Sequence, residues 1–297
     1  MATQNPIVTG LTAYVEEHKS ELLTKSMLEG KSRQMMNLMT DVKSNTTLNL
    51  MDTDVVFQGL GCGWNESGTT EFSQRVLVPV GLEVNMAFCD KNLLKTWAQY
   101  EVKVAAGMET LPFEEKWVNS LVDSVNEKLE KMIYQGHSGQ TTEFEGLISI
   151  LDGDANTVKV SASSADTAYE FLKGVAKAIP VQVKNPVILV STPLYREYMQ
   201  DLVAANLYHY DPANGENEYR LPATDIKVIA VDGLIGADNY VIAADLNNLF
   251  YGVSADGDED TFDLFYSKDN REFRFVLEFI AGVQVAFPDE IVLGKRG

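Results

Sequence analysis

The sequence predicts an α+β protein in which one elongated part and one compact part share a single chain. Two observations predict the elongated part: a long stretch of alternating apolar residues at 273–287 and a long amphipathic stretch at 113–135. The third observation is the succession of strand-like and helix-like segments over 153–245, which predicts a compact α/β unit. The 297 residues are 45% hydrophobic, enough for a sizeable buried core.

Composition and charge narrow the classes of protein that fit. The chain carries 24 basic and 43 acidic residues, and its net charge of −19 repels nucleic acid instead of attracting it. Basic and acidic residues balance over 1–45, so no basic arm compensates. No apolar run is long enough to cross a membrane, and the first residues lack the basic and apolar regions of a secretory signal. We therefore expect a protein made and used in a cytoplasm, without a membrane partner.

The first third of the chain predicts a helical segment followed by a long β-hairpin. Residues 11–43 have a helical pattern, and their methionine-rich end is more typical of core packing than of an adaptable contact surface. A strand pattern then begins at residue 46, passes through a glycine-rich turn and returns to Cys89. An isolated two-stranded hairpin is marginal in water, so we expect its own domain or another subunit to cover it. A further helix is expected at 91–107.

The two cysteines, Cys62 and Cys89, lack the spacing of a zinc site or of a disulfide framework. Pairing of the two hairpin strands would make them neighbours, so a disulfide stays open as an alternative to two reduced thiols. A cytoplasm keeps thiols reduced, and the reduced form is therefore the expected one.

The middle and the end of the chain predict two long elements. The helix expected at 113–135 has an apolar stripe recurring every three or four residues, with Gly136 after its end, and it would span about 34 Å. The alternating stretch from Phe273 to Phe287 would span roughly 50 Å as one strand, with Gly282 as a point where it can bend. An ordinary strand has about 5–6 residues, so this one indicates an elongated sheet.

Residues 153–245 predict a conventional α/β arrangement. Strand patterns at VKVSAS, PVILVS, DIKVIAVDGL and NYVIAAD accompany two helical segments, the first of them capped by Ser164 or Asp166. The strand patterns NLFYGV and TFDLFYSK that follow are expected to return to the elongated part, together with the terminal strand. The compact unit would therefore be an insertion.

No motif carries a complete catalytic or ligand-binding chemistry. The glycine-rich stretch at 59–64 has Trp64 where a dinucleotide-binding loop needs glycine, and GKS at 30–32 lacks the first glycine of a phosphate-binding loop. The acidic turns that begin at Asp152 and Asp256 lack the glycine and the glutamate of a calcium loop. No two histidines share a metal-binding motif; the three in the chain are His18, His137 and His209. We therefore expect no cofactor, no metal and no enzymatic activity.

With this layout, the sequence resembles the tailed-phage major capsid proteins of the Hong Kong 97-like fold, in particular those of phages that infect gut Bacteroidales. The resemblance covers nearly the whole chain and rests on phrases, not on a catalytic motif. The phrases are CGWNESGTTEFSQR at 62–75, PFEEKWVNSLVDSVNEKLEKMIYQG at 112–136, EFEGLISIL at 143–151 and YSKDNREFRFVLEFIAGVQVAFPDEIV at 266–292.

The resemblance implies a role for each segment. Residues 1–45 would be an N-terminal arm, 46–90 an extended hairpin called the E-loop, 91–152 with 246–297 a peripheral domain that holds a long spine helix and long strands, and 153–245 an inserted α/β axial domain. It also implies self-assembly into pentamers and hexamers of an icosahedral phage head, which encloses double-stranded DNA without binding it specifically. The other implied partners are a portal and a separate scaffold or decoration proteins. The protein would be part of the virion and would assemble in the host bacterial cytoplasm.

Two alternatives stay open at the level of sequence. One is an encapsulin-like compartment of the same fold, which would enclose protein cargo. The other is a soluble acidic binding or enzymatic protein. For a shell, exposed aromatic residues and arginines are the expected subunit contacts, although packing within the loop or an ordinary solvated strand face would explain them too. The interface candidates are Trp64, Phe72, Arg75, Arg271, Glu272, Arg274 and Glu278.

Overall fold

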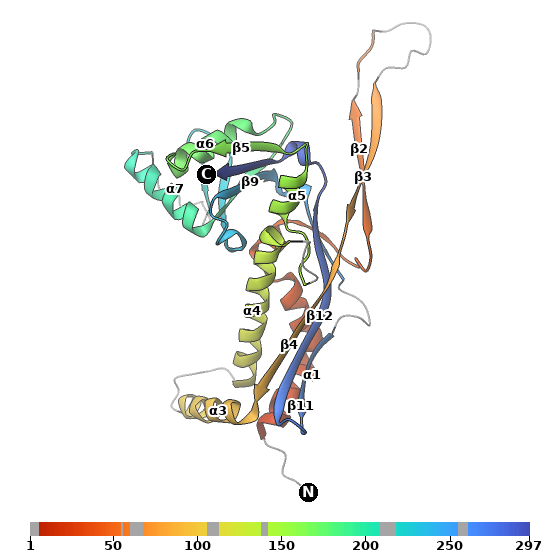
Figure 1. Cartoon of the computed structure of the whole chain (residues 1–297), viewed down its shortest axis with the longest axis vertical. Coiled ribbons are helices and arrows are strands. Elements are labelled where there is room, and N and C mark those ends of the chain that lie inside the picture. The colour runs from red at the N-terminus through yellow and green to blue at the C-terminus, as the bar shows by residue number, and fades with distance from the viewer. Residues whose placement is uncertain are drawn as a thin grey trace.

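The computed structural model shows an elongated molecule with a compact module at one end and a β-hairpin that projects beyond it (Figure 1). The structure describes residues 6–54, 56–59, 68–105, 113–137, 142–207, 218–254 and 261–297. One five-stranded sheet builds the elongated module, one six-stranded sheet builds the compact module, and the hairpin forms a separate two-stranded sheet. The predicted α+β class is confirmed.

The elongated module is organised around the long strand β12 (Glu272–Val285). Strands β11 (Thr261–Ser267) and β10 (Leu249–Val253) pair antiparallel with β12, and so does β4 (Val80–Cys89) along its other edge. The alternation read from the sequence is confirmed, since the odd-numbered residues of β12 are buried while the even-numbered residues up to Ile280 are partly exposed. At about 3.3 Å per residue, 14 residues span roughly 46 Å.

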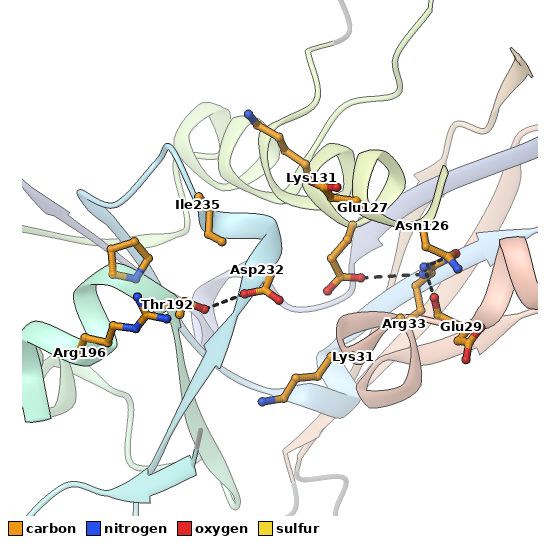
Figure 2. A pocket seen from close by; sticks show the side chains of 13 residues that line it. Glu29, Lys31, Arg33, Asn126, Glu127, Lys131, Thr192, Arg196, Asp232 and Ile235 are labelled. Carbon is orange, nitrogen blue, oxygen red and sulfur yellow. Dashed lines mark hydrogen bonds and ion pairs between the residues drawn. The ribbon is translucent and has the colours of Figure 1, made fainter. Parts of the chain in front are cut away.

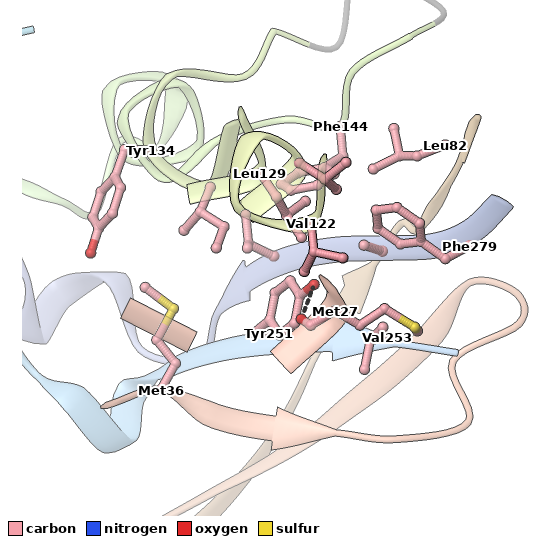
Figure 3. Packing of buried hydrophobic residues seen from close by; sticks show 14 of the residues in the cluster. Met27, Met36, Leu82, Val122, Leu129, Tyr134, Phe144, Tyr251, Val253 and Phe279 are labelled. Carbon is pink, nitrogen blue, oxygen red and sulfur yellow. Dashed lines mark hydrogen bonds between the residues drawn. The ribbon is translucent and has the colours of Figure 1, made fainter. Parts of the chain in front are cut away.

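Two long helices cover the buried face of this sheet. Helix α4 (Phe113–Gln135) has the predicted bounds, and α1 (Pro6–Leu28) lies beside it and against β11. Their apolar side chains meet those of the sheet in one continuous core, in which Val122, Leu129 and Phe279 are buried (Figure 3). The shorter α3 (Asp90–Ala105) follows β4, close to the helix expected at 91–107.

The N-terminal segment departs from the single helical stretch expected at 11–43. After α1, a short helix α2 (Lys31–Met35) and a strand β1 (Asn37–Met39) follow, and β1 pairs parallel with β10. A helical pattern cannot reveal this, because the partner of β1 lies more than two hundred residues later. The preference for core packing is confirmed for Met27 and Met36, which are both buried.

A buried polar cluster fastens the α1–α2 junction to α4. The guanidinium of Arg33 donates to the carbonyls of Ser26 and Met27, at 3.0 and 2.8 Å, and to the Asn126 side chain at 2.9 Å. The Glu130 carboxylate accepts from the backbone N–H of Ser32 at 3.0 Å. Burial lowers the pKa of Arg33, and the nearby Glu130 carboxylate opposes that shift. These charges satisfy backbone groups that the break between the two helices leaves unpaired.

The hairpin consists of β2 (Thr46–Asp54) and β3 (Thr69–Leu77), which pair antiparallel over their full length. The sequence predicted a return strand that runs on to Cys89, and this is wrong. The strand breaks at Val78 and Pro79, because β4 leaves the hairpin there to pair with β12. Cys89 therefore lies opposite Glu272 at the far end of β4, and Cys62 falls outside the described residues.

The compact module is a six-stranded sheet with helices packed against it. Its strand order is β5-β13-β9-β6-β8-β7. The strands are β5 (Val158–Ala162), β6 (Pro186–Ser191), β7 (Glu218–Arg220), β8 (Lys227–Val231), β9 (Tyr240–Asp245) and β13 (Val292–Arg296); the helices are α6 (Ala168–Ala178) and α7 (Thr192–Ala204), with α5 (Leu147–Gly153) leading into the module. Thr167, not Ser164 or Asp166, caps α6, because its side chain accepts from the Glu170 N–H.

One part of the expected domain division is wrong. Residues 246–297 were assigned to the elongated part, but β13 lies in the compact sheet, parallel to β5 and antiparallel to β9. Arg296 of β13 forms a two-pronged ion pair with Glu197 of α7, with both N–O distances at 2.8 Å. The chain therefore crosses from the compact to the elongated module and back again.

Candidate subunit interface

One face of the projecting hairpin is apolar and open to solvent. Phe72 of β3 and Met51 of β2 face each other across the hairpin, and their exposed fractions are 79% and 62%. Val76 lies on the same face and is also exposed, and Phe57, beyond the end of β2, is 96% exposed. Between these apolar side chains the Gln74 amide donates to the Asn49 side chain at 2.9 Å. The Phe72 prediction thus falls on a surface that nothing in the described chain covers.

The free energy that this face could gain by burial is considerable. Removing one Phe or Met side chain from water contributes about 1.5–3 kcal/mol. A two-stranded hairpin by itself is marginal, and contiguous exposed apolar surface marks an interaction site. The hairpin is therefore a surface suited to contact with another protein.

Arg75 does not share this face, although it was predicted as a contact residue. It lies opposite Leu48, and its guanidinium points back to the body of the molecule. There its Nη1 lies 2.8 Å from Asp154 Oδ2, and its Nη2 lies 3.5 Å from Gln284 Oε1. Trp64, the remaining hairpin candidate, lies outside the described residues.

Two of the interface candidates at the start of β12, Glu272 and Arg274, bond to each other. Glu272 accepts from Arg274 Nε at 3.0 Å and Nη2 at 2.9 Å, and the hydrogen bonds from Arg274 and Asn270 lower the pKa of Glu272. Arg271 occupies the tight turn between β11 and β12, with φ at +56°. This arrangement matches an ordinary solvated strand face as well as it matches a contact between subunits.

Glu278 lies in a different environment, which the sequence did not reveal. It is directly opposite Glu83 of β4, so two carboxylates sit side by side on the outer face of the sheet. Like charges directly opposite one another destabilise a sheet. A residue that carries a basic group, supplied from outside, would remove that repulsion.

The structure also shows an apolar groove that sequence reasoning missed. It lies between β4 and α4, has a volume of about 540 Å³ and is lined by Leu82, Val84, Met86, Leu121, Val125 and Phe279, among others. Lys128 at its margin is the basic residue of the lining. The alternating apolar residues of β4 were a signal for it, but only the position of α4 makes them into a groove.

A second hollow lies where the two modules meet (Figure 2). Its volume is about 580 Å³, and four basic and four acidic side chains line it, so it has no preference for an anion or a cation. Several of them are already engaged: Thr192 donates to Asp232 at 2.7 Å, and Lys31 donates to the Ala230 carbonyl at 3.0 Å. Nowhere in the described ranges do three metal-ligating side chains come together. No helix there has the length and hydropathy to span a membrane.

Comparison with known proteins identifies the fold. No protein-family model matches the sequence, and no curated protein matches it. Among solved structures, the capsid of a native GTA particle has 11% sequence identity and a TM-score of 0.59, with 92% of this chain and 90% of that chain covered. The procapsid of satellite phage P4, which includes a size determination protein, has 8% identity and a TM-score of 0.60, with 95% and 99% covered.

A third similar structure comes from outside the phages named so far. It is a virus-like particle from Pyrococcus furiosus, with 10% identity, a TM-score of 0.54 and coverage of 94% of this chain and 98% of that chain. The likeness in each case runs over almost the entire length of both chains. The chain therefore has the Hong Kong 97-like capsid fold, as its sequence predicted.

Proposed function

We propose that this chain is a major capsid protein that assembles into the pentamers and hexamers of an icosahedral phage head around double-stranded DNA. The observation that carries the proposal is the exposed apolar face of a hairpin that the described chain leaves uncovered, on a fold shared with capsid subunits. A repeated contact with a neighbouring copy would bury this face once per subunit.

The groove between β4 and α4 is a suitable place for that contact. Its lining is largely apolar, and Leu82, Val84 and Met86 line it at strand spacing. The hairpin face offers Phe72 and Val76, which are four residues apart on β3, as Leu82 and Met86 are on β4, so at about 3.3 Å per residue the two spacings match. Contact between these two surfaces of different copies is heterologous, and such contacts generate rings when the rotation closes.

The acidic net charge fits a shell whose inner wall does not bind the DNA that it encloses. Net charge of −19 per subunit gives no attraction for phosphate groups, so packaged DNA would be enclosed without being bound specifically. We further propose a portal and a separate scaffold or decoration proteins as partners, assembly in the host bacterial cytoplasm, and a source among phages of gut Bacteroidales. The procapsid of satellite phage P4 contains a size determination protein, which supports a helper of that kind.

An encapsulin-like compartment of the same fold is the second candidate, and the likeness to the Pyrococcus furiosus virus-like particle is compatible with it, because that particle is not named a phage head. The contents of purified shells distinguish the two. Absorbance dominated by nucleic acid at ~260 nm supports a phage head, and a co-purifying enzyme on a gel supports a compartment.

The proposal is tested by size exclusion and negative-stain microscopy of the purified chain. Shells, tubes or rings of subunits are expected, and Phe72→Asp is expected to abolish them by placing a charge in the buried contact. Val181→Asp is the matched control, because Val181 is fully exposed on the compact module. A species that stays monomeric even with co-expressed scaffold candidates would instead support the soluble acidic protein.

A further inference from the structure

The root of the hairpin is a close-packed joint. Leu77, the last residue of β3, is fully buried and lies over Gly252 of β10 and Gly282 of β12, which pair with each other. A Cβ atom at Gly252 would lie 2.9 Å from Leu77 Cδ1, and one at Gly282 would lie 3.1 Å from Pro79 Cα. The sheet therefore has no side chain at the place where the hairpin meets it.

Polar contacts around Arg75, two residues before Leu77 on β3, join the hairpin to the end of α5 and to β12. Arg75 of β3 lies 2.8 Å from Asp154, which ends α5 at the entrance to the compact module. Its other terminal nitrogen is 3.5 Å from Gln284 of β12. Gln284 in turn donates to the Val76 carbonyl of β3 at 2.7 Å. The hairpin, the long strand and the entrance to the compact module are thus connected through the side chains of Arg75, Asp154 and Gln284.

The surroundings of this cluster favour a fixed geometry. Exposed fractions of the Arg75 and Asp154 side chains are only 23% and 16%, so water weakens the charge-assisted bond little. Asp154 is held in place by the Asn156 N–H, which donates to Oδ1 at 2.9 Å. Hydrogen bonds from Arg75 and Asn156 lower the pKa of Asp154, so the carboxylate stays charged near neutral pH. Arg75 Nε is buried and finds no acceptor among the described residues, which is a cost that a solvent-exposed ion pair would avoid.

We propose that Arg75, Asp154 and Gln284 form a latch that fixes the direction in which the hairpin leaves the body of the subunit. In this proposal Arg75 is a positioning residue and makes no contact with a neighbouring copy. The inference rests on the proposed function, because the direction of the hairpin matters for assembly only when another copy covers it.

A small rotation of the hairpin at its root produces a large displacement at the far end of its strands. Nine residues of β2 span about 30 Å, so a rotation of about 10° at the root moves the far end of the strands by about 5 Å. A displacement of that size exceeds what a packed contact tolerates. The latch is expected to narrow the range of hairpin directions and so to make the curvature of the shell uniform.

The test measures the hairpin direction directly in the unassembled subunit. Spin labels are placed on Thr69, the exposed residue at the far end of β3, and on Lys177 of the compact module, in a Cys62→Ser, Cys89→Ser background, and the distance distribution is recorded by pulsed electron resonance. Arg75→Ala is expected to broaden the distribution by about the 5 Å derived above. Asp154→Asn is the second variant. It removes the charge and keeps the shape of the side chain, and the same broadening is expected from it, so the latch can still be tested if Arg75→Ala fails to fold.

Two further variants make the result specific. The exchanged pair Arg75→Asp with Asp154→Arg is expected to restore a narrow distribution, which loss of folding would not allow. Arg220→Ala removes an exposed ion pair with Asp225 on the compact module and is expected to change nothing. An unchanged distribution in folded Arg75→Ala or Asp154→Asn would overturn the latch.

Assembly is scored separately on the same variants. Particles of mixed size and shape from Arg75→Ala, against uniform particles from Arg220→Ala, support the role in assembly. If the unmodified chain forms no particles even with co-expressed scaffold candidates, the proposed function fails, while the distance measurement still decides whether the latch exists. If particles form and the distribution does not respond, the latch alone is wrong.

Discussion

At the scale of single residues, charges in this protein act where the chain changes direction. Arg33 fastens the break between α1 and α2, Arg75 fastens the root of the hairpin, and Arg296 fastens the last strand to α7. Each guanidinium bonds carbonyl or carboxylate oxygens that belong to a different element. The sequence named Arg75 as a candidate subunit contact, and the structure shows an ion pair with Asp154 of the same chain, which lies far along the sequence and carries no local signal.

Removal of the Arg33 guanidinium should be costly, because it leaves Glu130 buried without its counter-charge. We expect Arg33→Ala to lower the free energy of unfolding by about 3–5 kcal/mol. The double variant Arg33→Met with Glu130→Gln should recover part of this loss, since it removes both charges. Urea denaturation measures both, and Arg220→Ala, which breaks an exposed pair with Asp225, is the control that should cost less than about 1 kcal/mol. Equal losses in Arg33→Ala and Arg220→Ala would contradict the anchoring role.

Acid should weaken the attachment of β13 through Glu197. The hydrogen bond from Arg296 holds the pKa of Glu197 below its ordinary value of 4.5. A carboxyl group with a lowered pKa stabilises the folded state above that ordinary value and loses the contribution as the pH falls through the folded pKa. Stability measured by thermal melting should therefore fall below about pH 4.5 in the unmodified chain and fall less steeply in Glu197→Gln. Identical acid profiles would show that the pair does not contribute.

At the scale of elements, periodicity identified the helices and strands but not their partners. The bounds of α4 and the alternation of β12 follow from patterns within the element itself, so they could be predicted. The break between β3 and β4, the strand β1 and the place of β13 depend on which strand lies alongside, and a pattern with period two is the same in either sheet. The apolar groove was missed for the same reason, since two distant elements make it.

The glycine pair beneath Leu77 gives an element-scale prediction. Gly282→Val should lower the free energy of unfolding by about 1–3 kcal/mol, because the new side chain meets the backbone of Val78 and Pro79. Gly81→Val on β4 is the matched control, since nothing lies within 4 Å of an added Cβ there. Chemical denaturation measures both variants, and a neutral Gly282→Val would mean that the root is loosely packed.

At the scale of the whole molecule, charge opposes association while the hairpin favours it. Subunits that each carry −19 repel one another, so the apolar face of the hairpin must overcome that repulsion for a shell to form. The repulsion between subunits and the apolar contact of the hairpin respond differently to salt, because dissolved ions screen charges and leave apolar contacts largely intact.

Assembly is therefore expected to increase with ionic strength. Raising the salt from ~0.1 to ~1 M shortens the screening length from about 10 to about 3 Å, and light scattering should show more and faster particle formation. Phe72→Asp should remain unassembled at every salt concentration, since it lacks the apolar contact. A decrease in assembly with salt would show that ion pairs between copies, not the hairpin face, hold the particle together.

The position of β13 between β5 and β9 also affects how the chain is synthesised. During translation β5, β6, β8 and β9 emerge early, but the space between β5 and β9 stays empty until residues 292–296 have been made. Every strand of the elongated sheet has been synthesised by then. A chain that stops before residue 292 thus keeps a gap inside its compact sheet, and we expect such a chain to fold incompletely and to be excluded from an ordered assembly.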